Sequence, residues 1–92
     1  MAGRPGMVIN KGDPDAGGVL VLLRGKGGMV VLSQLRATDG ALAWMRASGA
    51  APVAEEVADA YVARQRQRDP DLWVVEFESP DFVPPFDAKI LP

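Results

Sequence analysis

Residues 69–78 read DPDLWVVEFE and carry the most apolar strand signal of the chain, directly after its only convincing helix signal. In a β-conformation over about residues 72–78, Trp73, Val75 and Phe77 all point to one face, because successive side chains alternate between the faces of a strand. The pattern therefore predicts a half-buried strand with a large apolar face.

A helix is predicted over about residues 53–68, immediately before this strand. Apolar side chains recur at the i, i+3, i+4, i+7, i+8 spacing that forms one stripe along a helix. The stripe consists of Ala54, Val57, Ala58, Tyr61, Val62 and Gln65. Acidic residues in the first turn and arginines in the last match the helix dipole, and Asp69-Pro70 ends the helix. We expect Trp73 and Phe77 to pack on this stripe.

The first half of the chain predicts further strands joined by tight turns. The expected strands are residues 7–10, 19–24, 29–36 and 41–46. Hairpin turns are expected at Gly25–Gly28 and at Ala37–Gly40, where glycine supplies the backbone angles that such turns require. The segment 19–24 is apolar on both faces, which is typical of a central strand covered on both sides. Trp44 can face either the core or a partner, and a core position is favoured.

These elements together predict an α+β fold. We expect an antiparallel β-meander of three to four strands, one amphipathic helix packed on it, and a final strand returning to the sheet. The 92 residues form a single domain, with a compact core over residues 7–79 and a proline-rich extended tail over residues 80–92.

Composition excludes several kinds of chemistry. The chain has no cysteine and no histidine, which removes disulfides, thiolate chemistry, the commonest general base and the commonest metal ligand. The longest apolar run, Val19–Leu23, is far shorter than the ~20 residues that a membrane-spanning helix needs. A cytoplasmic location is therefore expected.

The two ends of the sequence carry opposite charge. Residues 1–46 hold six basic and three acidic side chains, whereas residues 69–92 hold six acidic side chains and one lysine. If the last strand pairs beside strands of the first half, these charges complement each other within one domain. A charged docking surface is the alternative interpretation.

No motif indicates a cofactor or a metal. A calcium loop starting at Asp13 would place Arg24 where a glutamate is needed, and GKGG at residues 25–28 precedes a strand, so it lacks the helix N-terminus of a phosphate-binding loop. The closest carboxylate pairs are Asp13/Asp15, Asp69/Asp71 and Glu76/Glu78, which turns or a solvated strand face explain. No catalytic residue is assigned, and a carboxylate-based enzyme is kept as an alternative.

The helix ends in RQRQR, which suggests contact with a polyanion through Arg64, Arg66 and Arg68. At about 100° per residue, Arg64 and Arg66 point ~160° apart, so the arginines form a ring of charge around the helix end. A nucleic-acid-binding or other polyanion-binding accessory protein is therefore an alternative, and charge that compensates the helix dipole is the simpler interpretation.

The tail carries five large apolar side chains among its prolines. We assign Phe82, Val83, Phe86, Ile90 and Leu91 as a candidate interaction surface. A segment of this kind usually lies extended over a domain surface, its own or that of a neighbour.

Two segments, Gly12–Leu23 and Ala60–Glu78, resemble a family of small bacterial proteins known as domain of unknown function 1491. The resemblance covers most of residues 7–78, with the tail outside the pattern, and it implies no activity, cofactor or catalytic residue. It also implies an additional amphipathic segment upstream, without which one face of the strand at 19–24 would be uncovered. We expect an oligomer partner or the apolar tail to cover that face.

The expected function is that of a small non-catalytic protein-interaction or regulatory module. Its partner is expected to be another protein or a second copy of the chain in a homo-oligomer, without a cofactor and without contact to a membrane.

Overall fold

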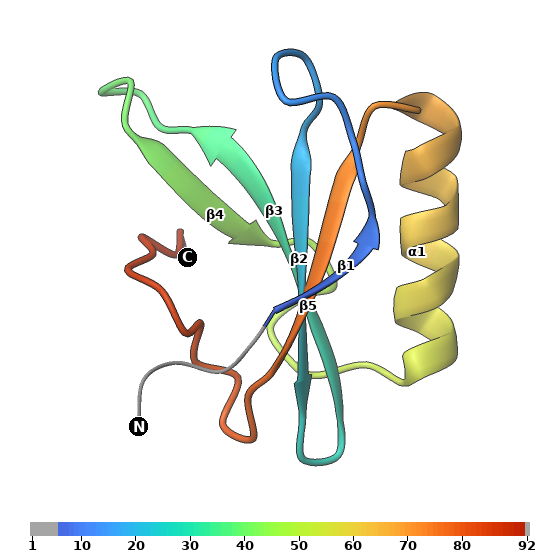
Figure 1. Cartoon of the computed structure of the whole chain (residues 1–92). Coiled ribbons are helices and arrows are strands. Elements are labelled where there is room, and N and C mark those ends of the chain that lie inside the picture. The colour runs from blue at the N-terminus through green and yellow to red at the C-terminus, as the bar shows by residue number, and fades with distance from the viewer. Residues whose placement is uncertain (1–5, 92) are drawn as a thin grey trace.

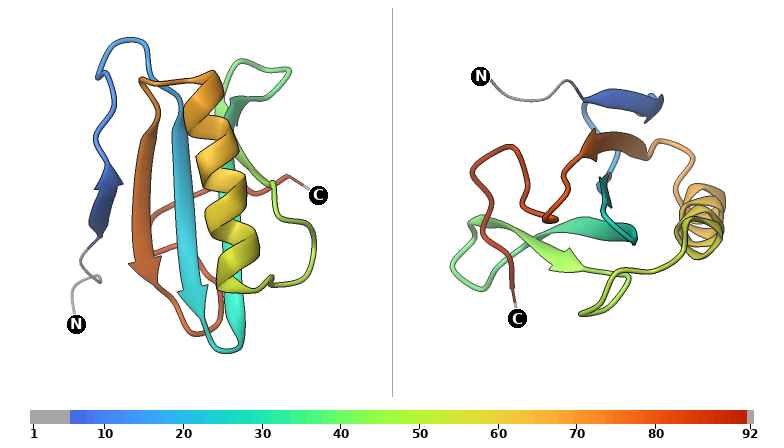
Figure 2. Two further views of the ribbon diagram at one scale, coloured as in Figure 1. Left: turned by 90° about the vertical axis from the view of Figure 1, so that its right-hand side faces the viewer. Right: turned by 90° about the horizontal axis from the view of Figure 1, so that it is seen from below.

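The computed structural model describes residues 6–91, and within them it contains one helix and a mixed sheet of five strands, so the fold is α+β. The elements are β1 (Met7–Asn10), β2 (Val19–Gly25), β3 (Gly28–Arg36), β4 (Leu42–Arg46), α1 (Glu55–Arg68) and β5 (Trp73–Glu78). The order across the sheet is β1-β5-β2-β3-β4, with α1 on one face and the C-terminal segment on the other (Figure 1, Figure 2).

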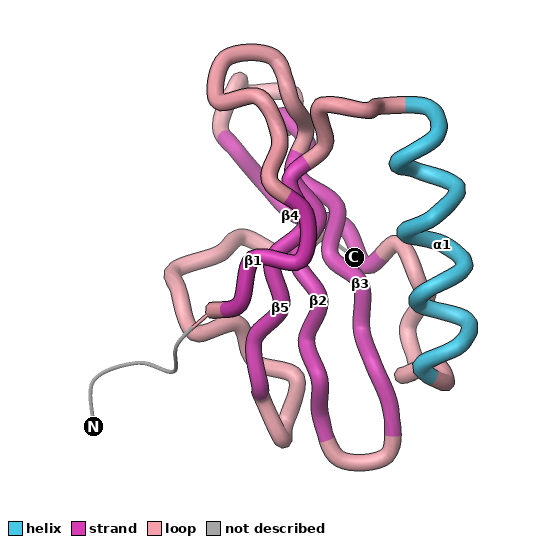
Figure 3. The backbone as a smooth tube through the Cα atoms, turned by 45° about the vertical axis from the view of Figure 1, so that its right-hand side comes forward, coloured by secondary structure: helices cyan, strands magenta, loops and turns pink. Residues whose placement is uncertain are grey.

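The β2-β3-β4 meander is antiparallel, and its turns lie where they were predicted. The final strand returns to the sheet as predicted, but the sheet is mixed and not purely an antiparallel meander, because β5 lies between β1 and β2 and runs parallel to β2. The reason is the crossover made by α1: the helix carries the chain back along the sheet, so β5 starts from the same end as β2 (Figure 3).

The helix begins at Glu55, two residues after the predicted start, because Val53 forms a β-bridge with Met29. The two residues exchange backbone hydrogen bonds in both directions, each 2.8 Å long. At the other end, the Asp69 amide donates to the Gln65 carbonyl and the helix stops as predicted. Among the described residues, no helix is both long enough and apolar enough to cross a membrane.

The face of the sheet under α1 holds one half of the core. Ala58 and Val62 are the buried residues of the helix, with Tyr61 partly buried beside them. The sheet residues they meet are Leu20, Leu22, Met29, Val31, Leu72 and Val74. The predicted stripe is wrong at Val57, which is 54% exposed, and at Ala54, which is exposed and precedes the first helical residue.

The predicted contact of Trp73 and Phe77 with the helix is also wrong. Within β5 it is the fully buried Val74 that faces α1, whereas Phe77 packs on the opposite face of the sheet. Trp73 is half-buried, and its indole N–H donates to the carbonyl of Asp13 at 3.1 Å. The face of Val74 also carries Glu76 and Glu78, so alternation favoured the aromatic face for the contact with the helix, and that inference failed.

The C-terminal segment covers the other face of the sheet. It supplies Phe82, Phe86, Ala88 and Ile90 to a second core cluster, built on Val21, Leu23, Val30, Leu32 and Trp44. An oligomer partner or the tail was expected to cover one face of β2, and in this structure the tail covers it. Trp44 is buried here, with its ring centroid 5.5 Å from that of Phe86, which confirms a core position.

Candidate functional site

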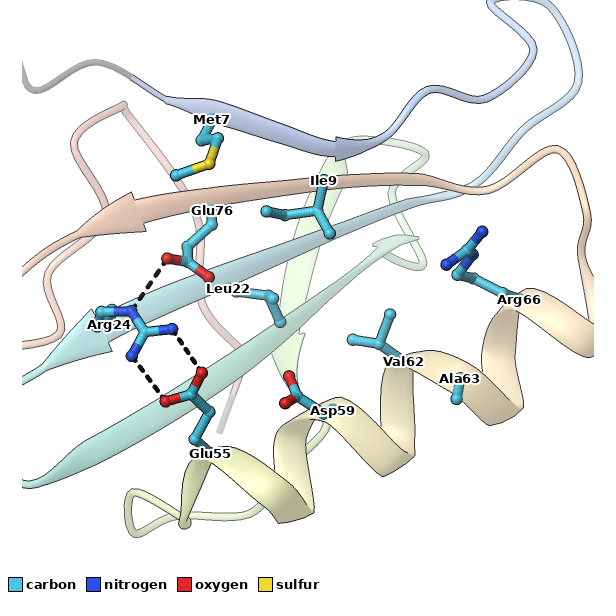
Figure 4. A pocket seen from close by; sticks show the side chains of 10 residues that line it. All are labelled: Met7, Ile9, Leu22, Arg24, Glu55, Asp59, Val62, Ala63, Arg66 and Glu76. Carbon is cyan, nitrogen blue, oxygen red and sulfur yellow. Dashed lines mark hydrogen bonds and ion pairs between the residues drawn. The ribbon is translucent and has the colours of Figure 1, made fainter.

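A groove lies beside α1 on the helix side of the sheet, and Figure 4 shows the side chains that line it. It has a volume of about 460 Å³. We call it the α1–β1 groove. Its lining consists of Met7, Ile9, Leu22, Arg24, Glu55, Asp59, Val62, Ala63, Arg66 and Glu76.

Strand register and helix spacing bring these side chains together. Met7 pairs with Glu76, and Glu76 pairs with Leu22, so the three lie in one row across β1, β5 and β2. On α1 the lining residues are Glu55, Asp59, Val62, Ala63 and Arg66, which recur at the three- and four-residue spacing of one helix face. The groove floor is therefore largely apolar, interrupted by the Glu76 carboxylate, and further charged side chains lie along the rim.

Arg24 connects β2, β5 and α1 at one end of the groove. Its Nε donates to Glu76 at 3.0 Å, and its two Nη atoms donate to the carboxylate oxygens of Glu55 at 3.0 and 3.1 Å (Figure 4). The hydrogen bonds to Glu55, then those to Glu76, raise the pKa of Arg24, while the same contact with Arg24 lowers the pKa of Glu55. Arg24 and Glu55 are therefore held in their charged forms.

We expect Glu55→Gln to destabilise the protein at pH 7 and to have almost no effect at pH 2. The folded state lowers the pKa of Glu55, so its contribution is present above the usual glutamate pKa of 4.5 and is lost as the pH falls through the lowered value. The measurement is the urea midpoint of wild type and variant between pH 2 and pH 7.

Glu56→Gln is the matched control. Glu56 lies in the same first turn of the helix, so this substitution removes the same charge from the same end of the helix dipole. Among the described residues it forms no ion pair. An equal pH-dependent loss in both variants would attribute the effect to the dipole and contradict the role of the Arg24 contact.

Asp59 and Arg66 lie further along the groove rim and are both exposed. Within residues 6–91 neither forms an ion pair. They are seven positions apart on the same side of α1, about two helical turns. The rim thus presents one anionic and one cationic side chain to an incoming partner.

The predicted polyanion contacts do not form one surface. Arg64, Arg66 and Arg68 are all exposed, but the Arg64 guanidinium lies 6.0 Å from the ring centre of Tyr61, while Arg66 lines the groove. This separation agrees with the ring of charge expected around the helix end. Polyanion binding stays a prediction.

Most residues of the predicted interaction surface on the tail pack against the sheet of their own chain. Phe82, Phe86 and Ile90 pack on the sheet, and Leu91 is half-buried. Only Val83 is open to solvent, with 59% of its surface exposed. The tail thus lies over its own domain, which is one of the two placements expected for it, and contact of these five residues with a partner stays a prediction.

Two of the carboxylate pairs stabilise turns, as expected. The Asp13 carboxylate accepts from the amide of Asp15 at 2.8 Å, and the Asp69 carboxylate accepts from the amides of Asp71 and Gly18. Within the described part of the chain, no three acidic side chains come together as metal ligands would.

Sequence reasoning missed the groove itself. Arg24 carried a usable signal, since it follows the apolar strand with the alternation that places it on the face of Leu20 and Leu22. The exposed Met7 and Ile9 carried none, because their position beside α1 depends on how β1 pairs with β5.

The chain is similar to known proteins over almost its whole length. Residues 1–87 match the model of a family described as DUF1491, protein of unknown function. The match includes most of the tail, which the resemblance had placed outside the pattern. No curated protein matches the chain.

Three solved structures are similar to this fold. A crystal structure of a DUF1491 family protein from Caulobacter crescentus CB15 is 33% identical, covers 94% of this chain and 80% of its own, and has a TM-score of 0.80. An NMR structure of a DUF1491 family protein from the same organism is 32% identical over 99% of this chain and 83% of its own, also at 0.80. A solution structure from A. tumefaciens, 23% identical over 97% and 81% of the two chains with a TM-score of 0.76, shares the fold.

Proposed function

We propose that this chain, which belongs to the DUF1491 family, is a small non-catalytic protein-interaction module that binds a polypeptide partner in the α1–β1 groove. The observation that carries the proposal is the exposure of apolar side chains on the open half of the sheet. Met7 and Ile9 are 58% and 45% exposed, although they point into a groove with a largely apolar floor.

The open half follows from the dimensions of the elements. Five strands span roughly 19 Å between the outer two at ~4.8 Å spacing, whereas a helix with its side chains is about 10 Å wide. One helix therefore covers about half of the sheet. In Figure 2, α1 lies over β2 and β3, and β5 and β1 extend beyond it.

The character of the groove favours a polypeptide. Protein interfaces typically have an apolar centre, in which methionine is enriched, and a polar rim. Here Met7, Ile9 and Leu22 supply the apolar centre, while Asp59 and Arg66 supply charges of both signs at the rim. A partner with apolar anchors and flanking charges of opposite sign fits this arrangement.

The state of the carboxylates in the groove also supports a non-catalytic role. A general acid or base works best with a pKa near the operating pH. Contact with Arg24 lowers the pKa of Glu55, away from neutral pH. The proposal also includes a bacterial origin, from the family resemblance, and the cytoplasmic location expected from the sequence.

The test compares two aspartate variants as baits in a bacterial lysate. We expect proteins retained by the wild type to be lost with Ile9→Asp, because it places an unpaired carboxylate in the apolar centre of the groove. The same proteins should be retained with Val83→Asp, which adds the same charge at an exposed apolar position outside the groove. Equal retention by both variants, with both folded by circular dichroism, contradicts the proposal.

A further inference from the structure

The end of the C-terminal segment is bound to the sheet in the manner of a peptide ligand. We call residues 84–91 the strap. Along it, Pro84, Phe86, Ala88 and Ile90 are half-buried, whereas the residues between them are exposed, which is the alternation of an extended chain lying on a surface.

The strap adds main-chain pairing to the free edge of β4. The amide of Trp44 donates to the carbonyl of Lys89, and the amide of Leu91 donates to the carbonyl of Trp44, both at 2.8 Å. Ile90 and Trp44 thus form a parallel bridge. This is the geometry by which an extended peptide extends a sheet at its edge.

An aromatic socket receives the central side chain of the strap. We define it as the rings of Trp44 and Phe77, whose centroids lie 5.5 and 5.9 Å from that of Phe86. The socket belongs to β4 and β5, which are fixed by the sheet. The strap supplies only the ring that fills it, as a bound peptide would.

Charge also matches between the strap and the neighbouring turn. The Lys89 ammonium lies 3.9 Å from the Asp39 carboxylate in the turn between β3 and β4. The pKa of Asp39 is lowered, first by the hydrogen bond from the Ala41 amide and then by Lys89. This contact is exposed and weak, but it favours the same register as the backbone pairing.

The connection to the strap is suited to opening. Up to Val83 the chain is held by a turn, in which the Ser79 hydroxyl donates to the Val83 carbonyl at 2.6 Å. Phe82 adopts a φ of 61°, a left-handed conformation that is strained for a bulky residue. Pro84 and Pro85 follow, and their fixed φ angles keep the strap extended when it leaves the sheet.

We propose that the β4 edge and the aromatic socket form a binding site for an extended peptide, and that its second occupant is the strap of another copy of this chain. Two chains then exchange residues 84–91 reciprocally and keep every contact described above. The strap in its own chain competes at an effective concentration of about millimolar, so exchange is expected at high protein concentration or when that strap is weakened. The proposal is independent of the α1–β1 groove.

The first experiment weakens the strap in the full chain with Phe86→Ser and Ile90→Ser and adds the synthetic peptide PPFDAKIL, residues 84–91. In NMR spectra of the labelled variant, the peptide should move the Trp44 and Phe77 signals toward their wild-type positions. A peptide with the same two serines should bind at least about tenfold more weakly, because it lacks both apolar anchors. A folded variant whose signals do not respond to the wild-type peptide overturns the proposal.

The second experiment uses the wild-type chain and does not depend on how the variant folds. In a mixture of isotope-labelled and unlabelled chains at millimolar concentration, we expect a nuclear Overhauser effect between Trp44 of one chain and Phe86 of the other. The variant Val83→Ser changes an exposed side chain just before the strap and should leave this nuclear Overhauser effect unchanged. Contacts found only within single chains at the highest concentration overturn the exchange.

Discussion

Replacing Leu23 by alanine should lower the free energy of unfolding by about 3 kcal/mol, within the range measured for buried leucines. Leu23 has no exposed surface and lies in β2, the central strand of the described sheet, with Val30 and Phe77 as its strand neighbours. The C-terminal segment packs over the cluster that contains Leu23, so the cavity left by the substitution is enclosed and the surrounding side chains have little room to fill it. Urea denaturation of wild type and variant measures the loss.

Leu22→Ala provides the comparison for Leu23→Ala, because Leu22 is equally buried in the same strand but faces α1. If the C-terminal segment packs on the face of Leu23 as closely as α1 packs on the face of Leu22, the two variants should lose a similar free energy of unfolding. Val83→Ala, at an exposed position, should change it by less than about 0.5 kcal/mol. A loss below about 1 kcal/mol for Leu23→Ala alone would contradict the packing described for the C-terminal segment.

The secondary structure was largely predictable because its signals are local. The continuous apolar run at residues 19–23, the Asp39-Gly40 turn and the spacing of Ala58 and Val62 each depend on a few neighbouring residues. Each element forms within two residues of its expected place. The start of the helix was missed because Val53 is held by a strand distant in sequence, Met29, rather than by its own propensity.

Local signals did not predict the position of β5 in the sheet or which of its faces meets the helix. Trp73, Val74 and Val75 are all apolar, so a helix could pack on either face of this strand. Its place beside β2 also follows from the path of α1 and not from the strand sequence. Large aromatic side chains favoured the wrong face, because Phe77 is matched to Phe86 of the tail and not to the helix.

The candidate site was the least predictable part, since the α1–β1 groove takes its lining from four elements. Arg24, Glu55 and Glu76 are separated by up to 52 positions, and no motif connects them. The charge imbalance between the two ends of the chain did indicate that basic groups of the first half would meet acids of the second, and the Arg24–Glu76 pair is such a contact. The tail was correctly expected to lie over a surface, although Val83 remains outside it.

Gly17→Ala should destabilise the protein by about 1–3 kcal/mol, as overpacking of a rigid site does. A Cβ at Gly17 would overlap the backbone carbonyl of Asp71, which cannot move independently of the turn that leads into β5. That carbonyl accepts a hydrogen bond from the Asp13 amide at 3.0 Å, and the Gly17 amide donates to the Asp13 carbonyl. The loop before β2 and the turn before β5 are therefore in direct backbone contact at this glycine, which thermal or urea denaturation of the variant will test.

The adjacent glycine is the matched control, because it lies in the same loop with more room. A Cβ at Gly18 would lie 3.4 Å from the Asp69 carboxylate and 3.6 Å from the Leu72 side chain, which are contacts that side chains can accommodate. Gly18→Ala should therefore be neutral or slightly stabilising, since alanine restricts the unfolded chain. Equal losses at the two positions would mean that loop flexibility, and not the approach of Asp71, requires glycine here. The glycines of the segment at residues 12–18 would then serve as turn formers only.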